Sequence, residues 1–133
     1  MNEGRFLPAR ELLVFVQRPG GQRERLEELL RAVRDMAESL PGDTDGDTES
    51  DVDAPDQDVH GVLNLLVTNQ PFLTVSAAQQ LALVVVDVIE TLWFLDNVSV
   101  DEAVWYCRFG YDCHWGARLS IVLDELAKGT SRA

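Results

Sequence analysis

The sequence predicts an all-α fold, a single-domain bundle of five or six helices around one central apolar helix. Apolar residues recur every three or four positions from residue 22 to 40, as on one face of a helix. Two capping boxes, Ser76 with Gln79 and Ser99 with Glu102, mark helix starts independently of hydrophobicity. The run from Leu81 to Leu95 is apolar almost all round, as in a helix that other helices cover. Because 133 residues is the size of one domain, we expect residues 1–133 to form a single unit.

The N-terminal part predicts two helices. Pro8 suits a first helical turn, and Pro19-Gly20-Gly21 is a strong stop, so the first helix is expected from about Ala9 to Gln17. The second lies within residues 22–40. Its apolar face is supported on the opposite side by Glu27–Arg31 and Arg34–Glu38 pairs, which are four residues apart.

The next apolar segment, residues 59–68, has two interpretations. Its leucines favour a helix, whereas Gly61 and the valines allow a strand. The segment LLVFV near residue 14 has the same ambiguity. An α+β arrangement with short strands near 11–17 and 62–68 is therefore the alternative to the all-α fold.

The C-terminal half predicts three further helices and a turn. The first capping box opens the central helix, expected from about Ala77 to Asp96, and the second opens a helix from about Val100 to Arg108. A turn is expected at residues 109–112, where Gly110 lies between two aromatic residues. A last helix, about 113–128, should end at Gly129 in a left-handed cap.

The formal charge of −12 is concentrated in one segment. Residues 1–40 are neutral, residues 41–58 contain eight acids and no base, and the remainder carries −4. We therefore expect an acidic flexible loop at 41–58. Such a field repels nucleic acid and anionic membranes and attracts basic proteins, so neither nucleic acid nor membrane is an expected partner.

The acidic segment DTDGDTESDVDA, residues 43–54, resembles a calcium loop only in part. Carboxylates occupy its first, third, fifth and ninth positions. However, the position of the sharp turn holds Thr48, where glycine is required, and the position of the bidentate ligand holds Ala54, where glutamate is required. We predict no metal site here, and interpret the segment as a solvated connector or a recognition surface. Its candidate partner-binding residues are Asp43, Asp45, Asp47, Glu49, Asp51 and Asp53.

Aromatic residues cluster from residue 105 to 115. Tyr and Trp anchor many protein interfaces, so part of this cluster is a candidate contact surface. Trp105 and Phe109, four apart on a helix, are expected in the core. Tyr106 and Tyr111 or Trp115 are expected to be exposed, and all three are candidate partner-binding residues.

A few residues could support chemistry. Cys107, Cys113, His114 and the distant His60 could form a zinc site, but the C-x5-C-H spacing is weak evidence for one. Neighbouring helical residues point about 100° apart, so the adjacent cysteine and histidine make a poor catalytic pair. Asp87 and Glu90, three apart on the central helix, could act as acid and base. We predict no cofactor and no enzymatic activity, and keep a small metal- or thiol-dependent enzyme as an alternative.

These observations predict a small acidic binding protein that neutralises a basic protein, such as an immunity protein or antitoxin that inhibits a nuclease-like toxin. Its start has no charged segment followed by an apolar one, so we expect a cytoplasmic location and reduced thiols. Ten of the eleven basic residues are arginine, which is typical of GC-rich bacteria. A cytosolic chaperone for a secreted effector is a close alternative.

Overall fold

The computed structural model describes residues 2–41 and 54–130. Helices account for almost all of them, and no strand is present in these two ranges, so the all-α prediction is confirmed. A short 3-10 helix at Asn2–Phe6 is followed by α1 (Leu7–Val16), α2 (Arg23–Ser39), α3 (Val59–Asn69) and α4 (Val75–Asn97). The chain ends with α5 (Val100–Gly110), the π-helix η2 (Tyr111–Trp115) and α6 (Gly116–Thr130).

The α+β alternative is wrong because both ambiguous segments bury residues at helical spacing. In α1 the buried residues are Ala9, Leu12 and Val16, which are three and four positions apart. In α3 the buried residues are Leu66 and Asn69, and the Asp58 side chain caps the helix by accepting from the Gly61 amide at 3.1 Å.

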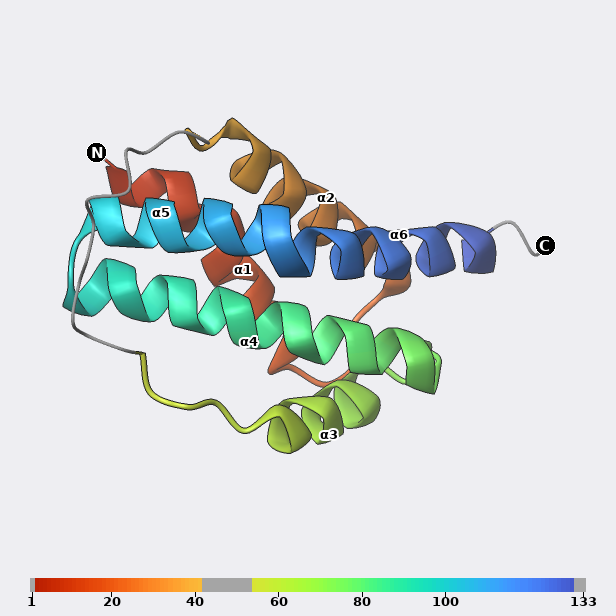
Figure 1. Ribbon diagram of the computed structural model, residues 1–133. Helices are drawn as coiled ribbons and strands as arrows, with labels where there is room; N and C mark the ends of the chain where they lie inside the picture. Colours follow the sequence, from red (N-terminus) through yellow and green to blue (C-terminus); the bar gives the residue numbers. More distant parts are fainter. Residues whose placement is uncertain (1, 42–53, 131–133) are drawn as a thin grey trace.

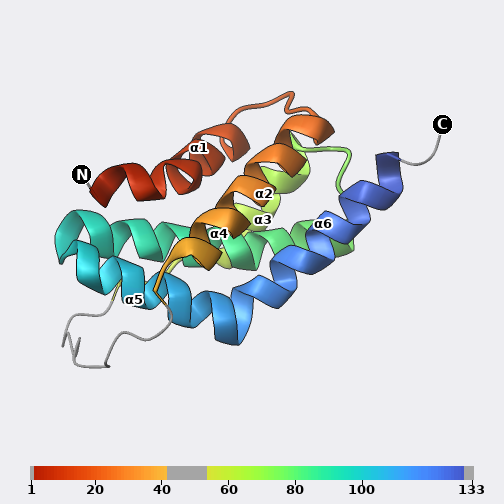
Figure 2. The same cartoon turned by 90° about the horizontal axis from the view of Figure 1, so that it is seen from above.

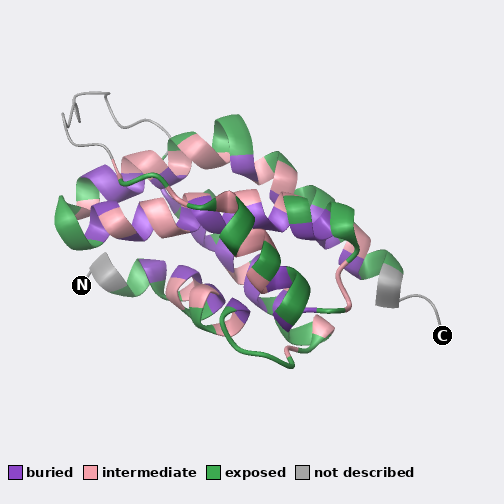
Figure 3. Cartoon of the chain, turned by 90° about the horizontal axis from the view of Figure 1, so that it is seen from below, coloured by how far each residue is buried: buried purple, intermediate pink, exposed green. Residues whose placement is uncertain are grey.

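The central helix is α4, as predicted. It packs against α1, α3, α5 and α6, and α2 lies over α1 and α6 (Figures 1 and 2). One apolar cluster draws residues from all six α-helices, and the buried positions face the interior of the bundle (Figure 3). Among the described helices, α4 alone is long and apolar enough to cross a membrane, but 61% of its most apolar stretch is buried, as in the core helix of a bundle.

The start of α4 differs from the prediction. Thr74, not Ser76, is the N-cap, and its hydroxyl accepts from the Ala77 amide at 3.0 Å. The same hydroxyl donates to Glu125 of α6 at 2.7 Å, so a contact between distant segments favours the earlier start. The second capping box is confirmed at its serine, because Ser99 accepts from the Glu102 amide at 3.1 Å.

The turn predicted at residues 109–112 is absent. The backbone passes from α5 through η2 into α6 as one unbroken helical path (Figure 1). A π-turn inserts one extra residue into a helix, and here it directs Trp115 into the core, where it is fully buried. Glycine is required just after this turn, since a Cβ at Gly116 would lie 2.5 Å from the Tyr111 carbonyl oxygen. The last helix continues to Thr130, beyond the cap expected at Gly129.

Candidate functional site

The six candidate acids of the segment 43–53 lie outside the described residues. The structure does describe where the segment joins the fold. Leu40 ends α2, and its carbonyl lies 3.5 Å from Nη1 of Arg108 on α5. Ala54, at the other end, packs against the core cluster. The chain therefore leaves the described part of the fold beside α5, just before the acidic segment.

Arg108 ties α5 to the end of α2. Its Nη1 donates to the carbonyl oxygens of Ala37 and Glu38, at 3.1 and 2.9 Å, as well as approaching that of Leu40. Its Nε donates to Asp112 at 3.0 Å. The last carbonyls of a helix have no partner within it, so a cation placed there satisfies them and the helix dipole.

The three aromatic residues predicted as partner-binding have internal contacts. The Tyr111 hydroxyl donates to Glu38 at 2.7 Å, and the Tyr106 hydroxyl donates to Glu90. Burial, followed by the hydrogen bond to the carboxylate, raises the pKa of both phenols, that of Tyr111 to about 12. Both rings are half-buried. The expectation that Trp115 is exposed is wrong, because η2 turns it inward.

The prediction for Trp105 and Phe109 is also wrong. They were expected in the core, yet their rings stack on the surface at 5.2 Å with an angle of 8°, and Phe109 is 50% exposed. The inner face of α5 is formed by other residues, mainly small ones such as Ala103 and Cys107. Small residues let α5 approach α4 closely and leave the large rings outside.

The stacked rings begin an exposed face on the long helical path. We call it the outer stripe; its residues are at least partly exposed and four positions apart: Trp105, Phe109, Cys113, Ala117 and Ile121. In an α-helix, steps of four residues drift by about 40° each. The wider π-turn of η2 reverses part of this drift, so the positions stay on one side.

Carboxylates accompany the outer stripe. Asp101, Asp112 and Asp124 are exposed along the same helical path. Asp112 is paired with Arg108, whose Nε donates to it at 3.0 Å, whereas Asp101 and Asp124 have no ion pair with another described residue. Arg118 donates to Gln80 of α4 at 3.1 Å. An apolar face with acids beside it suits a partner surface that combines apolar and basic groups.

Asp87 and Glu90, the two acids considered for chemistry, lie on the side of α4 that faces Tyr106, His114 and Arg118. We call these five residues the polar seam. Asp87 is half-buried, and its burial, followed by the charge of Glu90, raises its pKa from 3.8 to about 6. His114 and Arg118 act in the opposite direction on this pKa. The seam therefore holds a carboxyl that gains a proton well above the usual pH for aspartate.

The thiols do not form a reactive pair with this seam. Burial raises the pKa of Cys107 to about 12, which suppresses its thiolate, whereas Cys113 is exposed. Within residues 2–41 and 54–130, no group of three or more His, Cys, Asp or Glu side chains could hold a metal ion. His60 lies on α3, exposed.

Comparison with known protein families gives one match. The model of a family described as a domain of unknown function, DUF5063, matches residues 24–129. The chain belongs to the DUF5063 family. The match spans α2 to α6 and so includes the whole outer stripe and the polar seam of this DUF5063 chain, while α1 precedes it. No curated protein and no solved structure matches the chain.

The sequence contained a pattern that indicates the outer stripe, and the large number of aromatic residues in the segment 105–115 drew attention away from it. Trp105 and Phe109 are four apart, and so are Ala103 and Cys107, on a different side of the same helix. Only one of these two faces can contact α4. The pair of small residues suits a close helix contact, and this comparison would have assigned the rings to the surface.

Proposed function

We propose that this DUF5063 chain is a non-enzymatic binding protein that docks a basic protein through the outer stripe. The stacked Trp105–Phe109 pair carries the proposal, because it places two large aromatic groups on the surface of a helix braced against α2 and α4. Aromatic anchors on a rigid element bind with little loss of conformational entropy.

Charge supports a basic partner. The exposed carboxylates Asp101 and Asp124 lie on the same helical path as the stripe, and the chain enters the acidic segment just after Leu40, which lies beside α5. Opposite charges accelerate encounter, and apolar anchors then slow dissociation. Tyr106 and Tyr111 act in this proposal by fixing the helix that presents the anchors.

The partner class that fits best is a basic toxin, such as a nuclease, that an immunity protein or antitoxin neutralises in the bacterial cytoplasm. A nuclease must bind polyanions, so its active site is basic and can be blocked by a dense acidic surface. In this proposal the outer stripe provides the affinity and the acidic segment covers the basic site.

A chaperone for a secreted effector is the second candidate, and a groove between α1 and α2 favours it. This groove has a volume of about 400 Å³ and includes Leu7 and Val14, which are 53% and 50% exposed. Its lining combines apolar residues with charged ones, mainly arginines, and such a groove suits an amphipathic segment of a client protein. The two candidates use different faces and can be separated by mutation.

The test is an affinity capture from the native host at low salt, with four forms of the chain. These are the intact protein, a form with the acids of residues 43–53 changed to Asn or Ser, a form with Trp105→Ser and Phe109→Ser, and a form with Leu7→Ser and Val14→Ser. We expect one basic protein that the intact and α1 forms retain and the other two lose. Retention by the Trp105/Phe109 form would contradict the proposal, and loss with the α1 form alone would favour the chaperone.

A further inference from the structure

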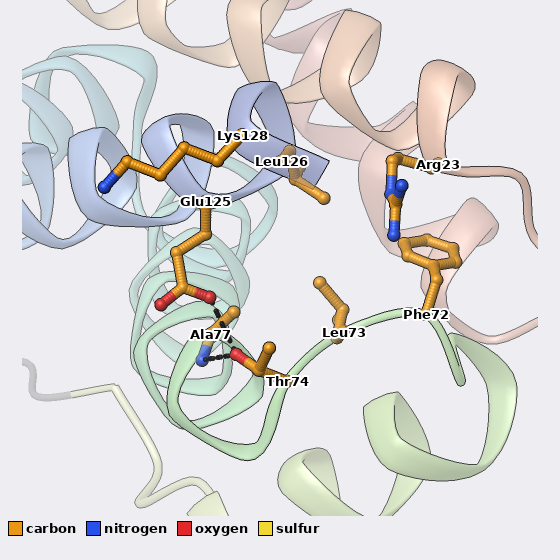
Figure 4. A pocket seen from close by; sticks show the side chains of 8 residues that line it. All are labelled: Arg23, Phe72, Leu73, Thr74, Ala77, Glu125, Leu126 and Lys128. Atoms are coloured by element: carbon orange, nitrogen blue, oxygen red, sulfur yellow. Dashed lines mark hydrogen bonds between the residues drawn. The ribbon is translucent and has the colours of Figure 1, made fainter. Parts of the chain in front are cut away.

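We propose that a cavity at one end of the bundle binds a small amphipathic carboxylate, a monoanion with an aliphatic or aromatic tail. The cavity lies between the start of α2, the start of α4 and the end of α6 (Figure 4). Its volume of about 360 Å³ is at the lower end of the roughly 300–1,000 Å³ typical of ligand sites. The inference does not depend on the proposed partner, because none of its lining residues belongs to the outer stripe.

The lining has an apolar part and a charged part. Phe72, Leu73, Ala77 and Leu126 provide the apolar surface. Arg23 and Glu125 place one positive and one negative group on opposite sides of the cavity, whereas Lys128 lines it with its carbon chain and directs its ammonium group away from Arg23 (Figure 4). Arg23 is thus the cation that faces the cavity, and the ligand group that it attracts is an anion.

Arg23 is the group that would hold the carboxylate. Arg23 is half-buried, and its guanidinium lies over the Phe72 ring, 5.7 Å from the ring centre. Among the residues that the structure describes, Arg23 has no hydrogen bond and no ion pair, although it can donate five N–H groups. The five N–H groups of a guanidinium form a planar fork, to which a carboxylate can bind by accepting two parallel hydrogen bonds.

Glu125 limits the charge of the ligand. Its carboxylate accepts from Thr74 at 2.7 Å and is therefore held at the cavity (Figure 4). A phosphate dianion would be repelled by this fixed negative charge more strongly than a carboxylate monoanion. Leu73 and Leu126 project between the two charged walls and would contact the tail (Figure 4).

The experiment is a titration of the full chain, followed by amide and methyl NMR shifts, with octanoate as the probe. We expect saturable shifts at Leu73, Ala77 and Leu126. Octylammonium has the same tail with the opposite charge, and acetate has the same charge without the tail. Each should bind at least about tenfold more weakly than octanoate, because each lacks half of the recognition.

Variants test the role of Arg23. Arg23→Gln should weaken octanoate binding at least about tenfold, and Arg23→Lys, which keeps the charge without the fork, should bind with intermediate affinity. Arg31→Gln on the same helix, two turns away, should leave the affinity unchanged. Circular dichroism checks that each variant is folded. The inference is overturned if octanoate does not bind, if octylammonium binds as tightly, or if folded Arg23→Gln binds normally.

Discussion

The polar seam predicts that Asp87 makes the fold less stable at neutral pH than in acid. Its pKa is raised from 3.8 to about 6, mainly by burial and then by Glu90. The folded protein therefore binds a proton at Asp87 more tightly than the unfolded chain does. As the pH rises from about 4 to 6, the folded state has to accommodate a charge that it disfavours, so the free energy of unfolding falls.

The magnitude follows from the same values. At about 1.4 kcal/mol per pKa unit, the shift from 3.8 to about 6 corresponds to a loss of at most about 3 kcal/mol in the free energy of unfolding. Solvent screens a half-buried carboxyl, so we take about half of this, roughly 1.5 kcal/mol. The Asp87 side chain has no hydrogen bond to another described residue that asparagine would lose. Asp87→Asn should thus stabilise the protein by about 1.5 kcal/mol near pH 7.5 and by about 0.5 kcal/mol near pH 4.

Urea denaturation at these two pH values, followed by tryptophan fluorescence, measures the effect. Asp124→Asn on the exposed side of α6 is the matched control, and its two differences should lie within about 0.5 kcal/mol of zero. The reasoning is refuted if Asp87→Asn destabilises the fold near pH 7.5, or if its effect is the same at both pH values. Either result would mean that His114 and Arg118 compensate the charge fully.

Three further predictions concern the helical path from α5 to α6. Arg108→Gln removes charged hydrogen bonds to carbonyls at the end of α2 and should lower the free energy of unfolding by about 2 kcal/mol, as measured by urea denaturation. A change below about 0.5 kcal/mol would show that these bonds are dispensable. Gly116→Ala brings a Cβ to 2.5 Å from a carbonyl oxygen of η2 and should lower the free energy of unfolding by about 2 kcal/mol. Gly4→Ala is the control, because a Cβ there meets nothing within 4 Å, and it should lower this free energy by about 0.5 kcal/mol or less. Equal losses for the two variants would contradict the π-turn geometry. In thiol labelling of the native protein only Cys113 should react, because Cys107 is buried with its pKa raised to about 12; rapid labelling of both would contradict the burial.

Much of the fold could be predicted from local patterns, because each helix buries residues at helical spacing. The limits of the prediction came from contacts between distant segments. Thr74 starts α4 because Glu125 of α6 accepts from its hydroxyl, and no local pattern contains this contact. Likewise, Gly110 indicated a turn, but the burial of Trp115 favours a π-turn that continues the helix.

The candidate site was less predictable than the fold. Aromatic residues suit both cores and interfaces, so composition alone could not tell which rings of the segment 105–115 are exposed. The choice depends on which face of α5 contacts α4, and the small residues Ala103 and Cys107 decide it. The carbonyl partners of Arg108 on α2 are about 70 residues distant in sequence, and no spacing rule could reveal them.

The most direct test of the proposed binding surface is photo-crosslinking in the native host. A photoreactive phenylalanine analogue replaces Phe109 in one form and Val67 of α3 in another, since both side chains are 50% exposed. The account predicts that position 109 crosslinks to one basic protein and that position 67 does not. Equal crosslinking at both positions, or crosslinking at position 67 alone, would contradict the assignment of the outer stripe as the docking surface.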